Sequence, residues 1–177
     1  MAQGERLFRA LALLTVGLVY STIVAGAYVR GSGSGLGCSH WPGCEPGQFF
    51  PDAANVHALI EWTHRTVAAL AGFAILATFL AAIRYKRHDR RLLLAATAAF
   101  LLLPVQAGLG AVTVFQGLNP VFSAAHMGVA AALFGAIVAT AIFAHIGPRP
   151  VRVEEAEAPS FRAGRGDAPP VAGRERA

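Results

Sequence analysis

Charge is scarce in this sequence. Lys, Arg, Asp and Glu make up 14% of the 177 residues, whereas about a quarter of a soluble globular domain is charged. With 55% hydrophobic residues and a mean hydropathy of +0.50, the chain is too apolar for an ordinary soluble domain of this length. Cysteine is also rare. Cys38 and Cys44, even with His40 beside them, are too few to complete the roughly four ligands of a structural zinc site.

Long apolar runs are what the sequence does contain. They cover residues 7–29, 59–83, 92–115 and 122–146, each at or above the roughly 20 residues that span a bilayer. Helices satisfy their own backbone groups in lipid, whereas an open sheet does not. We therefore expect an all-α integral membrane four-helix bundle over residues 1–146. Residues 147–177 are rich in proline, glycine and mixed charge, which predicts a disordered cytoplasmic tail.

The basic residues predict the orientation of the bundle. Arg6 and Arg9 precede the first apolar run, and the link "RYKRHDRR" separates the second from the third. Because cytoplasmic segments carry the excess of Lys and Arg, both termini and this link should be cytoplasmic, with loop 30–58 on the outer face of the plasma membrane. The net charge of +5 is thus a topology signal, and it does not indicate nucleic-acid binding. A cleaved signal peptide is the competing interpretation of the first run, which is longer than the usual ~7–15 apolar residues.

The outward loop contains "GSGSGLGCSHWPGC", in which glycines surround the two cysteines. A phosphate-binding loop is excluded, because no Lys-Ser/Thr follows and this side of a membrane holds no nucleotide pool. Two cysteines with five residues between them, on the oxidising side, favour a disulfide between Cys38 and Cys44 over free thiols. The pattern does not decide whether the pair also cycles between dithiol and disulfide.

Two histidines lie inside expected spans. His64 and His126 each follow the outer start of their run by one to two turns, so they should lie at similar depth on parallel helices. Such a pair suits haem iron ligation from opposite faces. The stretches "HRTVAALAGFAILAT" and "HMGVAAALFGAIVAT" align on these histidines, which predicts two similar helical hairpins. The small residues below the histidines would either leave room for a macrocycle or serve close helix packing; they are Ala68, Ala71, Gly72 and Ala130.

Three further polar side chains lie in or near the spans. Glu61 and Arg65 are four residues apart and should form an ion pair on one helix face. Gln106 follows Pro104, so it could reach a cofactor or satisfy the carbonyl that the proline leaves without a partner. The residues alone leave both roles open.

Four motifs together resemble the haem A synthase family of cytochrome oxidase assembly. They are "GAYVRGSGSGLGCSHWPGC", "IEWTHRTVA", "QAGLGAVTV" and "NPVFSAAHMGVA", in the same order from about residue 13 to 135. Members typically have eight helices in two similar halves, and this chain resembles one half, most like the amino-terminal one.

The resemblance implies oxidation of a methyl group of haem O to the formyl group of haem A. It implies that His64 and His126 ligate the haem iron, that Glu61 is the carboxylate required for chemistry, and that Cys38 and Cys44 are the outward cysteine pair. Arg65 could contact a haem propionate and Gln106 the cofactor. Implied partners are haem O, with haem B as a further candidate, the lipid bilayer, haem O synthase, a quinone acceptor and a second copy of the chain that completes an active oligomer.

Two alternatives use the same residues differently. A b-type cytochrome would need both histidines to carry electrons from quinol, without a special need for Glu61. A membrane thiol-relay protein would use the Cys38–Cys44 pair, although such relays usually contain a second cysteine pair and this sequence has none.

Overall fold

The computed structural model describes residues 2–147, so the expected tail, from residue 148 onward, lies outside the described residues. The described chain forms four helices and no β-strand: α1 (Ala2–Gly31), α2 (Val56–Tyr85), α3 (Arg90–Phe115) and α4 (Pro120–Ile146). All four are long and apolar enough to cross a membrane. The prediction of an all-α membrane bundle is confirmed.

Polar capping residues set where three of the helices begin. The side chains of Asn55, Asp89 and Asn119 accept hydrogen bonds from backbone N–H groups in the first turns of α2, α3 and α4. Such caps satisfy donors that have no partner within the helix. Each helix therefore begins beside its cap and extends two or three residues before the apolar run. As α1 also continues to Gly31, the connecting loop covers residues 32–55 rather than 30–58.

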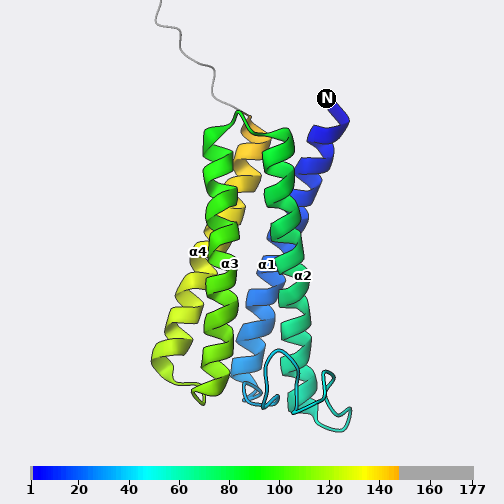
Figure 1. Ribbon diagram of the computed structural model, residues 1–177, viewed down its shortest axis with the longest axis vertical. Helices are drawn as coiled ribbons and strands as arrows, with labels where there is room; N and C mark the ends of the chain where they lie inside the picture. The colour runs from blue at the N-terminus through cyan, green and yellow to red at the C-terminus, as the bar shows by residue number, and fades with distance from the viewer. Residues whose placement is uncertain (1, 148–177) are drawn as a thin grey trace, which may run out of the picture.

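The helices form two antiparallel hairpins, α1–α2 and α3–α4 (Figure 1). Within each hairpin the two helices pack more extensively than helices of different hairpins do. The start of α1, the α2–α3 link and the end of α4 lie at one end of the bundle, here called the link end. Loop 32–55 and the α3–α4 turn lie at the other, here called the loop end. Consequently α2 and α4 both run from the loop end to the link end.

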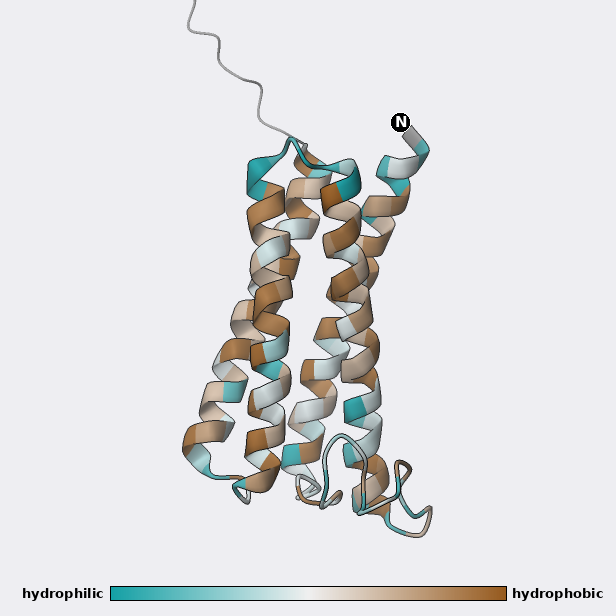
Figure 2. Cartoon of the chain, in the orientation of Figure 1, coloured by the Kyte–Doolittle hydropathy of each residue, from teal (hydrophilic) through white to brown (hydrophobic). Residues whose placement is uncertain are grey.

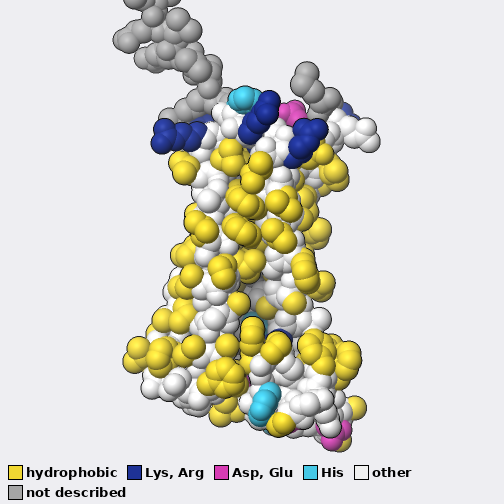
Figure 3. Space-filling model, in the orientation of Figure 1, with side chains coloured by type: hydrophobic (Ala, Val, Ile, Leu, Met, Phe, Trp, Pro, Cys, Tyr) yellow, Lys and Arg dark blue, Asp and Glu magenta, His cyan; other side chains and the backbone are white. Residues whose placement is uncertain are grey.

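Hydropathy varies along the bundle as expected for a membrane-spanning protein. The middle of every helix is predominantly hydrophobic, while polar residues concentrate at the two ends (Figure 2). Basic side chains gather at the link end (Figure 3). Three of them tie helices together there: Lys86 pairs with Glu5 at 2.7 Å, and Arg9 and Arg91 donate to the carbonyls of Ala144 and Gly147 at 3.0 and 3.1 Å.

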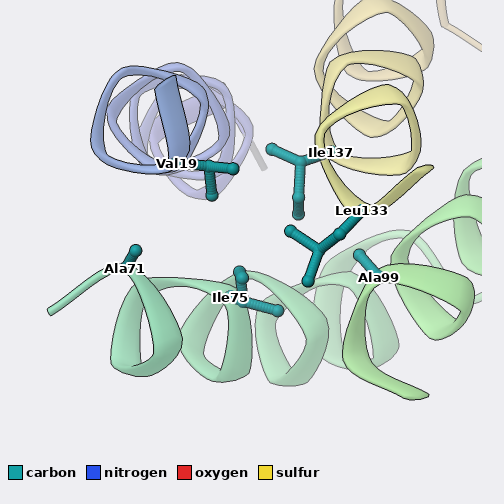
Figure 4. Packing of buried hydrophobic residues seen from close by; sticks show 6 residues of the cluster. All are labelled: Val19, Ala71, Ile75, Ala99, Leu133 and Ile137. Carbon is teal, nitrogen blue, oxygen red and sulfur yellow. The ribbon is translucent and has the colours of Figure 1, made fainter. Parts of the chain in front are cut away.

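The packed core occupies the middle and the link end. One cluster draws on all four helices and consists of Val19, Ala71, Ile75, Ala99, Leu133 and Ile137 (Figure 4). A second cluster at the link end includes Phe8, Leu92 and Ala144. Between α1 and α2, the buried hydroxyls of Thr15 and Thr78 are hydrogen-bonded at 2.8 Å.

The core does not continue to the loop end. No side chain is fully buried in residues 20–28 of α1, 62–70 of α2, 100–115 of α3 or 124–132 of α4. Interiors of folded proteins are normally close-packed. The bundle is therefore closed at the link end and incompletely filled over its loop-end half, and the surface there is hollowed between helices (Figure 3).

Candidate functional site

Both histidines expected to act as ligands lie in the loop-end half that the core leaves unfilled. His64 is eight residues after the start of α2 and His126 six after the start of α4, which places them about 12 and 9 Å along parallel helices. The structure thus brings together two imidazoles at similar depth on opposite hairpins.

Each histidine has a ring nitrogen without a partner. The Nδ1 atoms of His64 and His126 are buried and form no hydrogen bond with the described residues. Buried polar atoms in proteins are nearly always paired, so an unpaired imidazole nitrogen in each half of one site requires an explanation. A neutral imidazole with a free nitrogen is the donor that haem iron takes in bis-histidine sites. The two side chains fit the donor set of a bis-histidine haem site.

Gln106 contacts the second histidine. Its amide Nε2 lies 3.2 Å from Nε2 of His126 and donates to it, while its Oε1 is buried without a partner. In this arrangement Nδ1 of His126 carries the ring proton. Iron ligation through Nδ1 therefore requires the amide to turn over, so that Oε1 accepts from a His126 Nε2–H and the lone pair lies on Nδ1. The sequence left open a contact with a cofactor or with the carbonyl freed by Pro104, and the contact seen in the structure is with His126. α3 passes through Pro104 without interruption.

Glycines on the adjacent helices approach the two rings. A Cβ atom built on Gly26 of α1 would lie 3.0 Å from Cε1 of His64, and one built on Gly110 of α3 would lie 3.3 Å from Cε1 of His126. Sequence reasoning did not identify these contacts. The available signal was a glycine inside each of two helices, where glycine costs stability relative to alanine.

Glu61 and Arg65 of α2 lie against the loop. The side chain of Glu61 is 4% exposed, and its Oε1 pairs with the Arg65 guanidinium as expected. Its Oε2 accepts a hydrogen bond of 2.9 Å from the backbone N–H of Cys38. Arg65 also donates to the carbonyls of His40 and Gly43, at 2.5 and 2.7 Å. The pair therefore attaches the loop to α2, which was not predicted.

The loop itself is closed by the expected disulfide between Cys38 and Cys44. Both cysteines are completely buried and pack with Ala58 and Trp62 of α2. Close backbone approach makes this possible, because a Cβ on Gly37 would lie only 2.3 Å from the carbonyl oxygen of His57. The loop is thus docked on the first turns of α2, directly before His64.

An apolar cavity reaches His64 from the side of the bundle. It measures about 230 Å³ and lies between α1 and α2, where its walls include Tyr28, Ile60 and Thr63. His64 is therefore accessible from the lateral surface as well as facing the second hairpin. The small residues expected to leave room behave differently: Ala71 is part of the packed core and Gly72 faces Leu103 of α3.

Comparison with known proteins agrees with these observations. The chain matches the COX15-CtaA family, described as cytochrome oxidase assembly protein, over residues 9–56 and 51–164. It is 34% identical over 140 residues to the heme A synthase of Bacillus pumilus (strain SAFR-032), an alignment that covers 76% of this chain and 44% of that protein. It is 30% identical over 135 residues to that of Bacillus mycoides (strain KBAB4), covering 76% and 43%.

The chain spans less than half the length of these curated relatives. Nevertheless the family match covers most of its residues, including all four helices, the cysteine loop and both site histidines. By its sequence, this chain belongs to the COX15-CtaA family.

Proposed function

We propose that this chain carries out haem A synthase chemistry, the oxidation of a methyl group of haem O to the formyl group of haem A. The observation that carries the proposal is the pair of histidines with unpaired ring nitrogens, at similar depth, in the unfilled half of the bundle. The similarity to two heme A synthases supports it. In this proposal His64 and His126 bind the haem iron, and the bound haem supplies the conjugated ring that makes its methyl group oxidisable.

Glu61 is the proposed carboxylate of the reaction. Oxidation of the methyl group develops positive charge at its carbon atom. A nearby carboxylate either stabilises this charge or removes a proton from the water that attacks the carbon. Glu61 lies three residues before His64, within one helical turn. Because its two oxygens already contact Arg65 and the Cys38 N–H, acting on water requires it to exchange one of these partners. We propose Arg65 as a contact to a haem propionate and Gln106 as a contact on the His126 side.

The proposed orientation places the loop end on the outer face of the plasma membrane. The link end contains Arg84, Lys86, Arg87, Arg90 and Arg91 together with the basic start of α1. These charges favour the cytoplasmic side. A quinone in the bilayer is the proposed acceptor for the electrons removed from the methyl group. We further propose that the chain works as a homo-oligomer and receives haem O from a haem O synthase.

The test is pigment analysis of the purified, detergent-solubilised protein from cells that make haem O. We expect a low-spin bis-histidine spectrum and, after extraction, haem O together with haem A by mass. His64→Ala combined with His126→Ala should lose both. His88→Ala, in the exposed link, is the matched control and should retain them. Absence of bound haem from the unmodified protein would overturn the proposal.

One observation favours a second candidate, a b-type cytochrome that carries electrons from quinol. Both carboxylate oxygens of Glu61 have partners that attach the loop, so Glu61 has a structural task without any chemistry. Under this alternative only haem B would be bound, no formyl product would form, and Glu61→Gln would leave redox cycling largely intact. Loss of haem A formation in Glu61→Gln with haem still bound would instead support the synthase.

A further inference from the structure

Each ligand histidine is backed by a glycine from the other helix of its own hairpin. The Cβ position of Gly26 lies 3.0 Å from Cε1, 3.5 Å from Nδ1 and 3.6 Å from Nε2 of His64. The Cβ position of Gly110 lies 3.3 Å from Cε1 and 3.8 Å from Nδ1 of His126. Carbon atoms normally approach no closer than about 3.5 Å. A methyl group at either position would therefore push the ring toward the opposite hairpin or turn it.

Other glycines on the same helices show that this contact is specific. Nothing lies within 4 Å of a Cβ built on Gly17 of α1 or on Gly108 of α3. Gly108 is only two residues from Gly110, so close packing of α3 as a whole does not explain the contact. Glycine in a helix interior is unfavourable relative to alanine. At Gly26 and Gly110, unlike at Gly17 and Gly108, the methyl group of alanine would meet a histidine ring.

We propose that Gly26 and Gly110 are positioning residues that set the ring planes of the two iron ligands. This inference rests on the proposed haem ligation by His64 and His126. Groups behind a metal ligand fix its orientation and thereby tune the metal. His126 has Gln106 as a hydrogen-bonding partner at its other ring nitrogen, whereas Nδ1 of His64 is buried and unpaired. Contact with a glycine is the feature that the two rings share.

The two contacts differ in distance, so the proposal predicts which of the two alanine variants has the larger effect. The Gly26 contact is closer than the Gly110 contact, so alanine at Gly26 should turn its histidine further than alanine at Gly110. The energetic cost of forcing a side chain away from its preferred rotamer lowers the equilibrium constant for the state that requires it by roughly two- to tenfold. We therefore expect haem to transfer to an acceptor apoprotein roughly two- to tenfold faster in Gly26→Ala, with a smaller increase in Gly110→Ala.

The experiment uses the full chain, purified with its haem, in four variants. Gly26→Ala and Gly110→Ala are compared with Gly17→Ala and Gly108→Ala as matched controls. Electron paramagnetic resonance of the ferric state is the main readout, because the largest g value of a bis-imidazole haem depends on the angle between the ring planes. The two test variants should shift this value and the reduction potential, while the two controls should match the unmodified protein. Thermal unfolding of each variant checks that the bundle is intact.

The outcomes separate this inference from the proposed function. If the unmodified protein shows no bis-histidine haem signal, haem ligation itself is refuted. If it shows the signal and all four variants share its g value and transfer rate, the glycines do not position the ligands and the inference is overturned. A shift in the controls equal to that in the test variants would also overturn it. If Gly26→Ala does not accumulate, Gly110→Ala against Gly108→Ala decides the question in the same way.

Discussion

Replacing Glu61 by glutamine should release the cysteine loop from α2. The carboxylate accepts from the Cys38 N–H and pairs with Arg65, and glutamine of the same size turns an N–H group toward one of these two donors. Removing one charge of a buried pair costs about 3–5 kcal/mol. Arg65 keeps two loop carbonyls as acceptors, so we take the lower figure, about 3 kcal/mol, for the attachment of the loop.

The rate of disulfide reduction measures this attachment. Cys38 and Cys44 are completely buried, so a water-soluble phosphine reaches the bond only after the loop opens. At about 1.4 kcal/mol for each tenfold, a loss of about 3 kcal/mol increases the open fraction roughly a hundredfold. The disulfide of the Glu61→Gln variant should therefore be reduced roughly a hundredfold faster. The rate is measured by alkylating the freed thiols and following the mass of the intact protein.

A carboxylate in the same loop provides the control. Glu45 accepts a hydrogen bond from Ser39 at the exposed surface, where such contacts contribute about 0.2–1 kcal/mol. Glu45→Gln should change the reduction rate by less than about fivefold. A similarly small change in Glu61→Gln would refute the conclusion that Glu61 holds the loop. Loss of haem A formation without faster reduction would assign Glu61 to the chemistry alone.

Three further perturbations test other parts of the structure. Thr78→Val removes the buried hydroxyl pair with Thr15 and should lower the free energy of unfolding in detergent by about 0.6–2 kcal/mol. Thr15→Val in the same background should add little to this loss, and a fully additive double variant would contradict the pairing. Gly37→Ala places a methyl group 2.3 Å from the backbone oxygen of His57, so its disulfide should be reduced at least as fast as in Glu61→Gln. An unchanged rate would show that the loop packs differently. Gln106→Leu removes a buried Oε1 that has no partner together with the hydrogen bond to His126. Because these two effects oppose each other, the melting temperature of the haem-free protein should change little, and a clear loss of stability would contradict this.

The fold was predictable because hydropathy alone determines it. Four apolar runs of sufficient length, separated by polar segments, leave a helical bundle as the simplest arrangement in lipid. The Glu61–Arg65 pair followed from their spacing, and the disulfide from the compartment expected for the loop. These are properties of residue type and separation in sequence, which a single chain displays directly.

Which side of each helix packs against its neighbours was less predictable. A helix that is apolar all round gives no signal of which side faces its neighbours. Ala71 and Gly72 were therefore open to two interpretations, and the structure assigns both to helix packing. Among many glycines, nothing marked Gly26 and Gly110 as those beside a histidine. The docking of the loop was hidden for another reason, since it uses the backbone N–H of Cys38 and backbone carbonyls that every residue possesses.

The neighbours described for each histidine come from its own hairpin, and this has a consequence for biosynthesis. His64 is contacted by Gly26 of α1, and His126 by Gly110 and Gln106 of α3. Because the chain is made from its amino terminus, α1, α2 and the loop are able to pair while α3 and α4 are still on the ribosome. Each histidine is then already in place within its own hairpin when the two hairpins meet. The order of synthesis thus separates shaping the surroundings of the histidines from packing the core that joins the hairpins.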